Sequence, residues 1–280
     1  MRCCDILYLI MSVAVLLNLS DGLILGVDSA VTVFSGSDVS KVFEDSDKLF
    51  QLGSLKVGIA TYGVAGLEGR TIGSFIRQFE RDNHTQLPAM PLREIVEKLR
   101  EFFLAVYIRF AQQVFQLPFD QIPAENKGAL GLIVGGFSPD AFLSEVWEVV
   151  VPVHDTAYSA REIYKPGEYG SAWFATSEPI QRYIKGSAPN LVYDIVAFTQ
   201  KVAGRNLTQA EIDELVAVMR GYEYPTKIDG MPIRAGMDYV RFLVNLAINH
   251  YRFAATHPIV GGKAKLGVVT YAQESFQILE

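Results

Sequence analysis

The sequence offers few side chains at spacings that commonly perform chemistry. His154 and Asp155 are adjacent after an apolar run that reads as a strand, so they could form half of an acid–base pair, although a surface turn is the commoner role of such a pair. The other histidines, His84, His250 and His257, lie at no metal-ligand spacing from one another or from a cysteine. The chain has no nucleophile elbow, phosphate-binding loop, zincin motif or dinucleotide-binding motif.

Composition and charge narrow the class of protein. With 280 residues, 50% of them hydrophobic and 20% charged, the chain can bury a large core, which excludes a disordered or disulfide-stapled protein. The net charge of −6 and the absence of a basic cluster argue against nucleic acid as a partner. Cys3 and Cys4, the only cysteines, are adjacent and cannot form a disulfide framework. We therefore expect a reducing, cytoplasmic location.

The apolar run at residues 6–17 has three interpretations. An export signal would agree with Arg2 and with the length, but Asp5 stands where positive charge is needed and no small-x-small cleavage site follows. A membrane span would need about 20 apolar residues, and polar residues interrupt the run too early. A strand fits best, because an Asp-Gly turn at 20–22 separates this run from a second apolar run at 23–34. We predict a β-hairpin.

The rest of the chain alternates between groups of strands and groups of helices. No linker rich in Pro, Gly or Ser interrupts this order, so we expect a single α+β domain over residues 12–280 after an extra segment at 1–11. Thr208 and Glu211 form a capping box at the start of one helix. Further strands are expected at 48–54, 55–63, 129–137, 144–153, 261–271 and 274–279, and helices at 68–82, 91–115, 190–203, 208–222 and 235–254.

Four short motifs lie at related spacings in the first quarter of the chain. They are the Asp21-Gly22 turn, Val-Asp-Ser at 27–29, Asp-Lys-Leu-Phe at 47–50 and Ala-Thr-Tyr-Gly at 60–63. Each alone is a weak signal, but together they resemble the start of proteasome β-type subunits and their bacterial relatives. The resemblance is strong over residues 12–75 and looser over 170–271.

This resemblance implies a set of site residues. The nucleophile of the family begins the first strand, and the family's spacing places it at Ser12. Asp28 would hold a buried lysine charged and oriented, and that lysine is assigned to Lys41, seven residues before Lys48. The amide of Gly63 would donate to the tetrahedral oxyanion, since glycine lets the substrate backbone approach closely.

The implied activity is that of an N-terminal nucleophile hydrolase, which cleaves peptide or amide bonds through an acyl-enzyme on Ser12. If Ser12 is the first residue, its α-amino group, with a typical pKa of about 7.7–8.0, can accept the hydroxyl proton near neutral pH. Either Met11 is the true start and is trimmed, which we favour, or residues 1–11 are a short propeptide. No metal or organic cofactor is required.

Ser12 replaces the family's usual threonine, which is a permitted but less common variant. His257 and Val260, which stand where active members carry an aspartate and a serine, and the extra N-terminal residues favour an alternative. The alternative is a catalytically inactive, structural or assembly homologue. In either case the resemblance implies a four-layer sandwich, with two antiparallel sheets between helix layers, and a homo-oligomer such as a ring. We expect neither nucleic acid nor a membrane as a partner.

Overall fold

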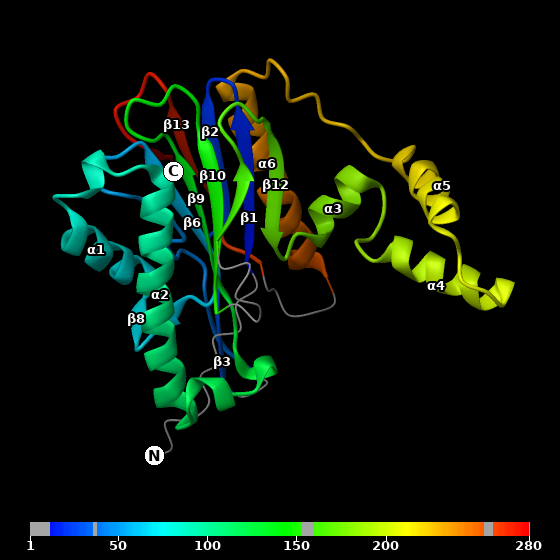
Figure 1. Cartoon of the computed structure of the whole chain (residues 1–280), viewed down its shortest axis with the longest axis horizontal. Helices are drawn as coiled ribbons and strands as arrows, with labels where there is room; N and C mark the ends of the chain where they lie inside the picture. Colours follow the sequence, from blue (N-terminus) through cyan, green and yellow to red (C-terminus); the bar gives the residue numbers. More distant parts are fainter. Residues whose placement is uncertain (1–11, 36–37, 153–159, 255–259, 280) are drawn as a thin grey trace. The chain divides into compact units, whose positions relative to one another are not determined.

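The computed structural model describes residues 12–35, 38–152, 160–254 and 260–279, and it is an α+β structure with antiparallel sheets and six α-helices (Figure 1). The α-helices are α1 (Ile72–Asn83), α2 (Leu92–Phe115), α3 (Glu178–Lys185), α4 (Leu191–Ala203), α5 (Gln209–Arg220) and α6 (Ile233–Phe253). The strands are β1 (Val13–Leu19), β2 (Gly22–Asp28), β3 (Val31–Ser35), β4 (Asp38–Phe43), β5 (Leu49–Gln51), β6 (Val57–Gly63), β7 (Gly66–Leu67), β8 (Arg70–Thr71), β9 (Leu130–Gly136), β10 (Glu145–Val151), β11 (Ala160–Tyr164), β12 (Gly170–Ala175), β13 (Ala264–Thr270) and β14 (Gln277–Leu279).

From Val13 on, the apolar N-terminal run forms the predicted hairpin, and residues 6–11 of that run lie outside the described residues. Strands β1 and β2 pair antiparallel from Ala14↔Val27 to Leu19↔Gly22, and the turn lies at Ser20 and Asp21. Every residue of both strands is buried. A strand covered on both faces has no polar side and therefore reads as a continuous apolar run, which explains why its sequence also resembles a signal peptide. The strand interpretation is confirmed.

Two five-stranded antiparallel sheets carry the fold. The first has the order β12-β1-β2-β13-β14, and the second has the order β11-β10-β9-β6-β5. The two sheets pack on each other through buried side chains from both, and a Cβ at Gly135 in β9 would lie 2.4 Å from the side chain of Leu23 in β2. The strand pair β1–β2 is thus central in the first sheet and enclosed by the second.

Helices cover the other faces of both sheets. The side chains of α1 and α2 join those of β6, β9 and β10 in one large apolar cluster. Helix α6 packs against β1, β2 and β13, where Gly26 leaves room for Val240 and Val244. Figure 1 shows α2 and α6 on opposite sides of the strands. All the predicted helices are present, and Thr208 and Glu211 form the predicted capping box on α5.

Several strands were not predicted from the sequence, and two of them, β4 and β12, are informative. The polar stretch after residue 34 contributes strand β4, which pairs with β3 in a separate two-stranded sheet. Strand β12 lies in a region that gave no clear pattern, and it pairs with β1 along its length, from Val13↔Ala175 to Asn18↔Gly170. Strand β12 forms one edge of the first sheet and pairs with the edge of β1 that does not pair with β2.

The contacts within the chain divide it into two compact units. One runs to Thr176 and resumes at Ile228, and the other is Ser177–Lys227. The second unit contains α3, α4 and α5, and neither α4 nor α5 buries a residue. The sequence shows no linker composition at these boundaries and gave no sign of the division.

The described residues contain no helix with the length and apolar character of a membrane span. They also contain no group of three or more His, Cys, Asp or Glu side chains that could hold a metal ion. The predicted acid–base candidates His154 and Asp155 lie outside the described residues, as does His257.

Candidate active site

Ser12 lies where the chain enters β1, and its side chain is fully buried. Its carbonyl oxygen accepts a hydrogen bond of 2.8 Å from the backbone N–H of Thr176, directly after β12. Because β1 is paired on both sides, the sheet itself fixes the backbone at its first residue. The Oγ atom of Ser12 accepts a hydrogen bond of 2.9 Å from Nζ of Lys48. The hydroxyl is therefore held against a buried ammonium group.

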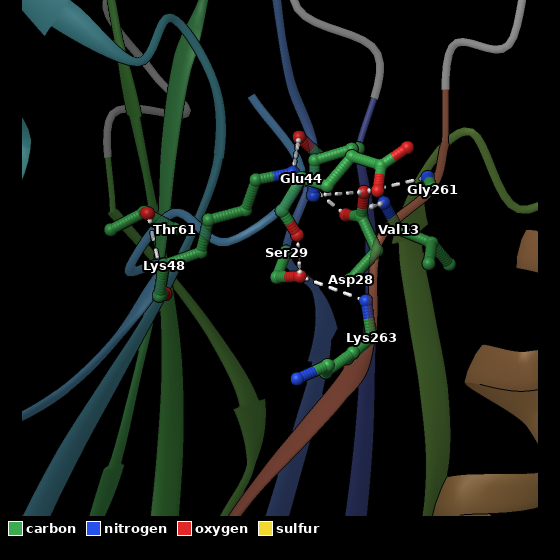
Figure 2. A network of polar contacts seen from close by, with 10 residues as sticks. Val13, Asp28, Ser29, Glu44, Lys48, Thr61, Gly261 and Lys263 are labelled. Carbon is green, nitrogen blue, oxygen red and sulfur yellow. Dashed lines mark hydrogen bonds and ion pairs between the residues drawn. The ribbon is translucent and has the colours of Figure 1, made fainter. Parts of the chain in front are cut away.

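Asp28 ends β2, beside the start of β1. Its Oδ1 accepts hydrogen bonds from Lys48 Nζ at 2.8 Å and from the N–H of Val13 at 3.1 Å. Its Oδ2 accepts from the N–H groups of Ala30 at 3.3 Å and Gly261 at 3.2 Å. Figure 2 shows the side chains of Asp28 and Lys48 pointing toward one another within this network. Three backbone amides thus fix the carboxylate, and through Val13 the carboxylate fixes the chain next to Ser12.

Lys48 directly precedes β5, in the second sheet. Its carbonyl oxygen accepts hydrogen bonds from the N–H and the Oγ1 of Thr61 in β6, at 2.8 and 3.3 Å. The side chain therefore starts on one sheet and reaches Ser12 and Asp28 on the other. This crossing explains how a lysine can be almost completely buried, with 4% of its surface exposed. A buried ammonium needs such partners.

The segment before Lys48 is held against the ends of β2 and β13. Ser29 Oγ donates a hydrogen bond to the carbonyl of Glu44 and accepts one of 2.8 Å from the N–H of Lys263 (Figure 2). The carbonyl of Ser29 accepts a hydrogen bond of 2.8 Å from the N–H of Ser46. These contacts fix the direction from which the Lys48 side chain enters the site.

The assignment of the lysine to Lys41 is corrected by the structure. Lys41 lies on β4, in the two-stranded β3–β4 sheet, and its side chain is exposed. Its Nζ lies 4.5 Å from the centre of the Phe43 ring. The residue beside Ser12 and Asp28 is Lys48, the lysine of the Asp-Lys-Leu-Phe motif itself. The motif thus contains the lysine of the site, and Lys41, seven residues earlier, lies elsewhere.

Burial dominates the electrostatics of the ion pair, whose atoms Lys48 Nζ and Asp28 Oδ1 are 2.8 Å apart. Burial raises the pKa of the Asp28 carboxyl, and the Lys48 charge opposes that shift. Burial lowers the pKa of the Lys48 ammonium, and the Asp28 charge opposes that shift. A lysine with a lowered pKa beside a hydroxyl is a typical arrangement of catalytic sites, because a proton moves between such groups at little cost.

Gly63 ends β6 at the border of a cavity. Its φ is +80°, and a Cβ there would lie 2.0 Å from the carbonyl oxygen of Ala129, so the position requires glycine. Gly63, Ser12 and Lys48 all line the same cavity, which has a volume of about 370 Å³. Ser12 and Gly63 therefore border one space that is large enough for a small ligand.

The strand end before β13 supports Asp28 through its backbone. Val260, which stands where an active family member would carry a serine, is buried and apolar. The next residue, Gly261, donates its N–H to Asp28 Oδ2 at 3.2 Å and accepts from the N–H of Ala30 at 3.1 Å. In the described residues the support that reaches Asp28 from this segment is a backbone amide.

The chain matches no protein-family model and no curated protein sequence. Among solved structures it is similar to the Anbu (Gly-1) mutant from Hyphomicrobium sp. strain MC1, with a TM-score of 0.52 and 10% identity, over 96% of this chain and 85% of that one. The fold of this chain is therefore similar to that of Anbu. At this level of identity the likeness concerns the fold alone.

Of the predicted site residues, Ser12, Asp28 and Gly63 lie together in the structure, and Lys41 lies elsewhere, on β4. Ser12 and Asp28 share the ion-pair network, and Gly63 borders the same cavity as Ser12. The signal for Lys48 was available, because it stands directly before an apolar strand in a recognised motif. A charged residue at the start of a buried strand is a better candidate for a buried ion pair than one in a polar stretch.

Proposed function

We propose that this protein is a proteasome-like N-terminal nucleophile hydrolase, which cleaves peptide or other amide bonds through an acyl-enzyme on Ser12. The observation that carries the proposal is the buried contact of Ser12 Oγ with Lys48 Nζ at 2.9 Å, with Asp28 Oδ1 2.8 Å from the same ammonium. The cavity that Ser12 and Gly63 border provides room for the substrate. The likeness in fold to Anbu agrees with this reading.

In the proposed reaction, the free α-amino group of Ser12 takes the hydroxyl proton as Oγ attacks the carbonyl carbon of the amide. The new C–O bond gives a tetrahedral oxyanion, which the N–H of Gly63 stabilises. The C–N bond then breaks, and the leaving amine takes the proton back from the α-ammonium group. Water attacks the acyl-enzyme with the same amine as base, and the acid product leaves with Ser12 restored.

Lys48 and Asp28 have supporting roles in this scheme. The Lys48 ammonium donates to Oγ and so stabilises the alkoxide that develops there. Its positive charge also lowers the pKa of a nearby α-amine, which keeps that amine unprotonated near neutral pH. Asp28 holds the ammonium in place and binds the N–H of Val13, so the same carboxylate positions both the lysine and the nucleophile's backbone.

The mechanism requires a chain that begins at Ser12. In the sequence Met11 precedes it, and while that peptide bond exists Ser12 has no free amine. The proposal therefore includes removal of the preceding residues, through a start at Met11 with trimming or through cleavage of residues 1–11. We also propose that the fold is the four-layer sandwich of this hydrolase class. We further propose that the chain assembles into homo-oligomers, and light scattering on the native protein would test this assembly.

The test combines the intact mass of the native protein with turnover of fluorogenic peptide amides. We expect a mass that begins at Ser12, turnover by the native protein, and none by Ser12→Ala. Lys48→Ala should lower kcat by about 10²–10⁴-fold, as loss of a proton-transfer or alkoxide-stabilising group does. Lys41→Ala, the matched control on the exposed strand β4, should change kcat by less than about twofold.

One set of results would contradict the hydrolase and favour the inactive homologue. A native protein whose mass begins at Met1, with no turnover and no acylation of Ser12 by an activated ester, would show that the buried network has a structural role. Turnover that persists in Ser12→Ala would contradict the assignment of the nucleophile instead.

A further inference from the structure

One wall of the cavity beside Ser12 is formed by α1. Gly73 and Arg77 lie four residues apart, so they share one face of this helix, and both line the cavity. Gly73 lets the helix approach Phe50, because a Cβ there would lie 2.5 Å from the ring. The other face of α1 is buried in the apolar cluster through Ile72, Phe75, Ile76 and Phe79. Packing therefore fixes the direction in which Arg77 points.

Arg77 carries an uncompensated positive charge. Its side chain is exposed, and it takes part in no ion pair or hydrogen bond among the described residues. Two other charged groups in the cavity wall form ion pairs. Lys48 is paired with Asp28, and Asp47 lies 3.1 Å from Lys265, which also pairs with Asp45 at 2.9 Å.

Arg70 adds a second guanidinium to the same wall. Its Nε and Nη1 donate to Ser74 Oγ at 3.2 Å and to Gln78 Oε1 at 2.9 Å, and its guanidinium carbon lies 4.1 Å from the centre of the Phe75 ring. All of these partners are uncharged, so they hold the group in place without neutralising it. No carboxylate of the described residues forms an ion pair with Arg70 or Arg77.

The remaining lining is mostly apolar. The residues Val31, Phe43, Phe50, Val64 and Ile72 border the cavity. A ligand that fits this lining has an apolar stem and a terminal anion, and a guanidinium binds a carboxylate with two parallel hydrogen bonds. The first turn of α1, which also borders the cavity and contains no acidic residue, adds its partial positive charge to that of the arginines.

We propose that Arg77 selects substrates whose acyl part carries a carboxylate, such as a glutamyl or aspartyl side chain on the acyl side of the cleaved amide bond. This inference rests on the proposed hydrolase function where it concerns the rate of cleavage. The preference of Arg77 for a carboxylate is a property of binding and can be measured without cleavage. The carboxylate would meet the guanidinium of Arg77 while the acyl carbon lies at Ser12. Arg77 is thus a specificity-determining residue and takes no part in the chemical step.

The kinetic experiment compares four fluorogenic amides that differ only in the acyl residue, which is Glu, Gln, Leu or Lys. We expect kcat/KM to be highest for Glu, by about tenfold over the isosteric Gln, as for a partly exposed charge-assisted contact. Arg77→Gln should remove this preference, and Arg77→Glu should favour the Lys substrate. Arg81→Gln, one turn further along α1 and outside the cavity lining, is the matched control and should keep the preference.

A binding experiment separates this inference from the hydrolase proposal. Isothermal titration of Ser12→Ala with the uncleaved Glu and Gln peptides measures selection without turnover. Tighter binding of the Glu peptide that disappears with Arg77→Gln supports the inference even if the native protein hydrolyses nothing. Equal binding and equal turnover of the Glu and Gln peptides, or a Glu preference that survives Arg77→Gln, would overturn it and leave the hydrolase proposal intact.

Discussion

Two ion pairs in different regions of the molecule have similar geometry and opposite electrostatics. In the candidate site, Asp28 and Lys48 lie 2.8 Å apart with almost no exposed surface. At the start of α5, Glu211 and Arg205 lie 2.5 Å apart with about half of the arginine side chain exposed, 54%. The pKa of Asp28 is raised because burial outweighs its partners. The pKa of Glu211 is lowered to about 2, because hydrogen bonds from Arg205 and Thr208 outweigh the opposing effect of burial.

The contrast shows that a short contact between opposite charges does not define what the pair does. The exposed pair stabilises its own charged form and caps a helix, as the Thr208 hydrogen bonds to Glu211 indicate. The buried pair contains two ions that are each unfavourable alone, so each depends on the other. That mutual dependence is what makes Lys48 and Asp28 suited to chemistry at Ser12 and poor contributors to net stability.

Removing the lysine of the buried pair should have the largest effect on stability. Lys48→Met leaves the Asp28 carboxylate buried without its counter-ion, and we expect a loss of about 3–5 kcal/mol in the free energy of unfolding. Arg205→Met removes the corresponding cation of the exposed pair and should change the urea midpoint only slightly. Urea denaturation followed by tryptophan fluorescence measures both. Equal losses in the two variants would contradict the contrast.

A double variant should recover most of that loss. Asp28→Asn with Lys48→Met removes both charges, and the amide can still accept from Val13 or Gly261. We expect the double variant to be more stable than Lys48→Met alone by about 1–3 kcal/mol, since residues in one network couple by this amount. If the two single losses simply add, the charges do not depend on one another and the account of the buried pair is wrong.

A buried polar group that has no hydrogen-bond partner among the described residues extends the comparison. Thr32 on β3 is 2% exposed, and its Oγ1 forms no hydrogen bond within the described part of the chain. Thr32→Val keeps the shape and removes the unpaired hydroxyl, so it should raise stability by about 1 kcal/mol. Thr61→Val is the matched control, because its hydroxyl bonds to the Lys48 carbonyl at 3.3 Å, and it should lower stability. Destabilisation by Thr32→Val would mean that its hydroxyl is satisfied by solvent.

The sequence predicted most of the fold because its strongest patterns are local. The Asp-Gly turn between two apolar runs predicted the β1–β2 hairpin, and helical periodicity predicted α1, α2 and α6. Strand β12 could not be predicted in the same way, because it is an edge strand of mixed composition whose only defining feature is its pairing with β1. The two-unit division also depends on contacts that no local pattern records.

The part of the candidate site that is built on the β1–β2 hairpin was predictable from the sequence. The part that depends on how the two sheets pack was not. Asp28 lies beside Val13, the residue after Ser12, because β1 and β2 pair in a register that the turn fixes. The lysine arrives from the other sheet, so its identity depends on how the sheets pack. Counting residues does not separate Lys41 from Lys48, whereas the place of Lys48 directly before an apolar strand and its burial do.

The smallest predicted effect, and the most direct test of the comparison, is the pH dependence of the two carboxylates. The folded pKa of Glu211 lies below the ordinary value of 4.5, so its contribution to stability is present above that pH and is lost as the pH falls toward about 2. The folded pKa of Asp28 lies above its ordinary value of 3.8, so the folded state binds the extra proton and stability falls as the pH rises through that window. Urea midpoints from pH 3 to 7 should therefore change in opposite directions, relative to wild type, for Glu211→Gln and Asp28→Asn. If both variants change the pH profile in the same direction, then the attraction of Lys48 outweighs burial at Asp28. The two ion pairs would then differ only in exposure.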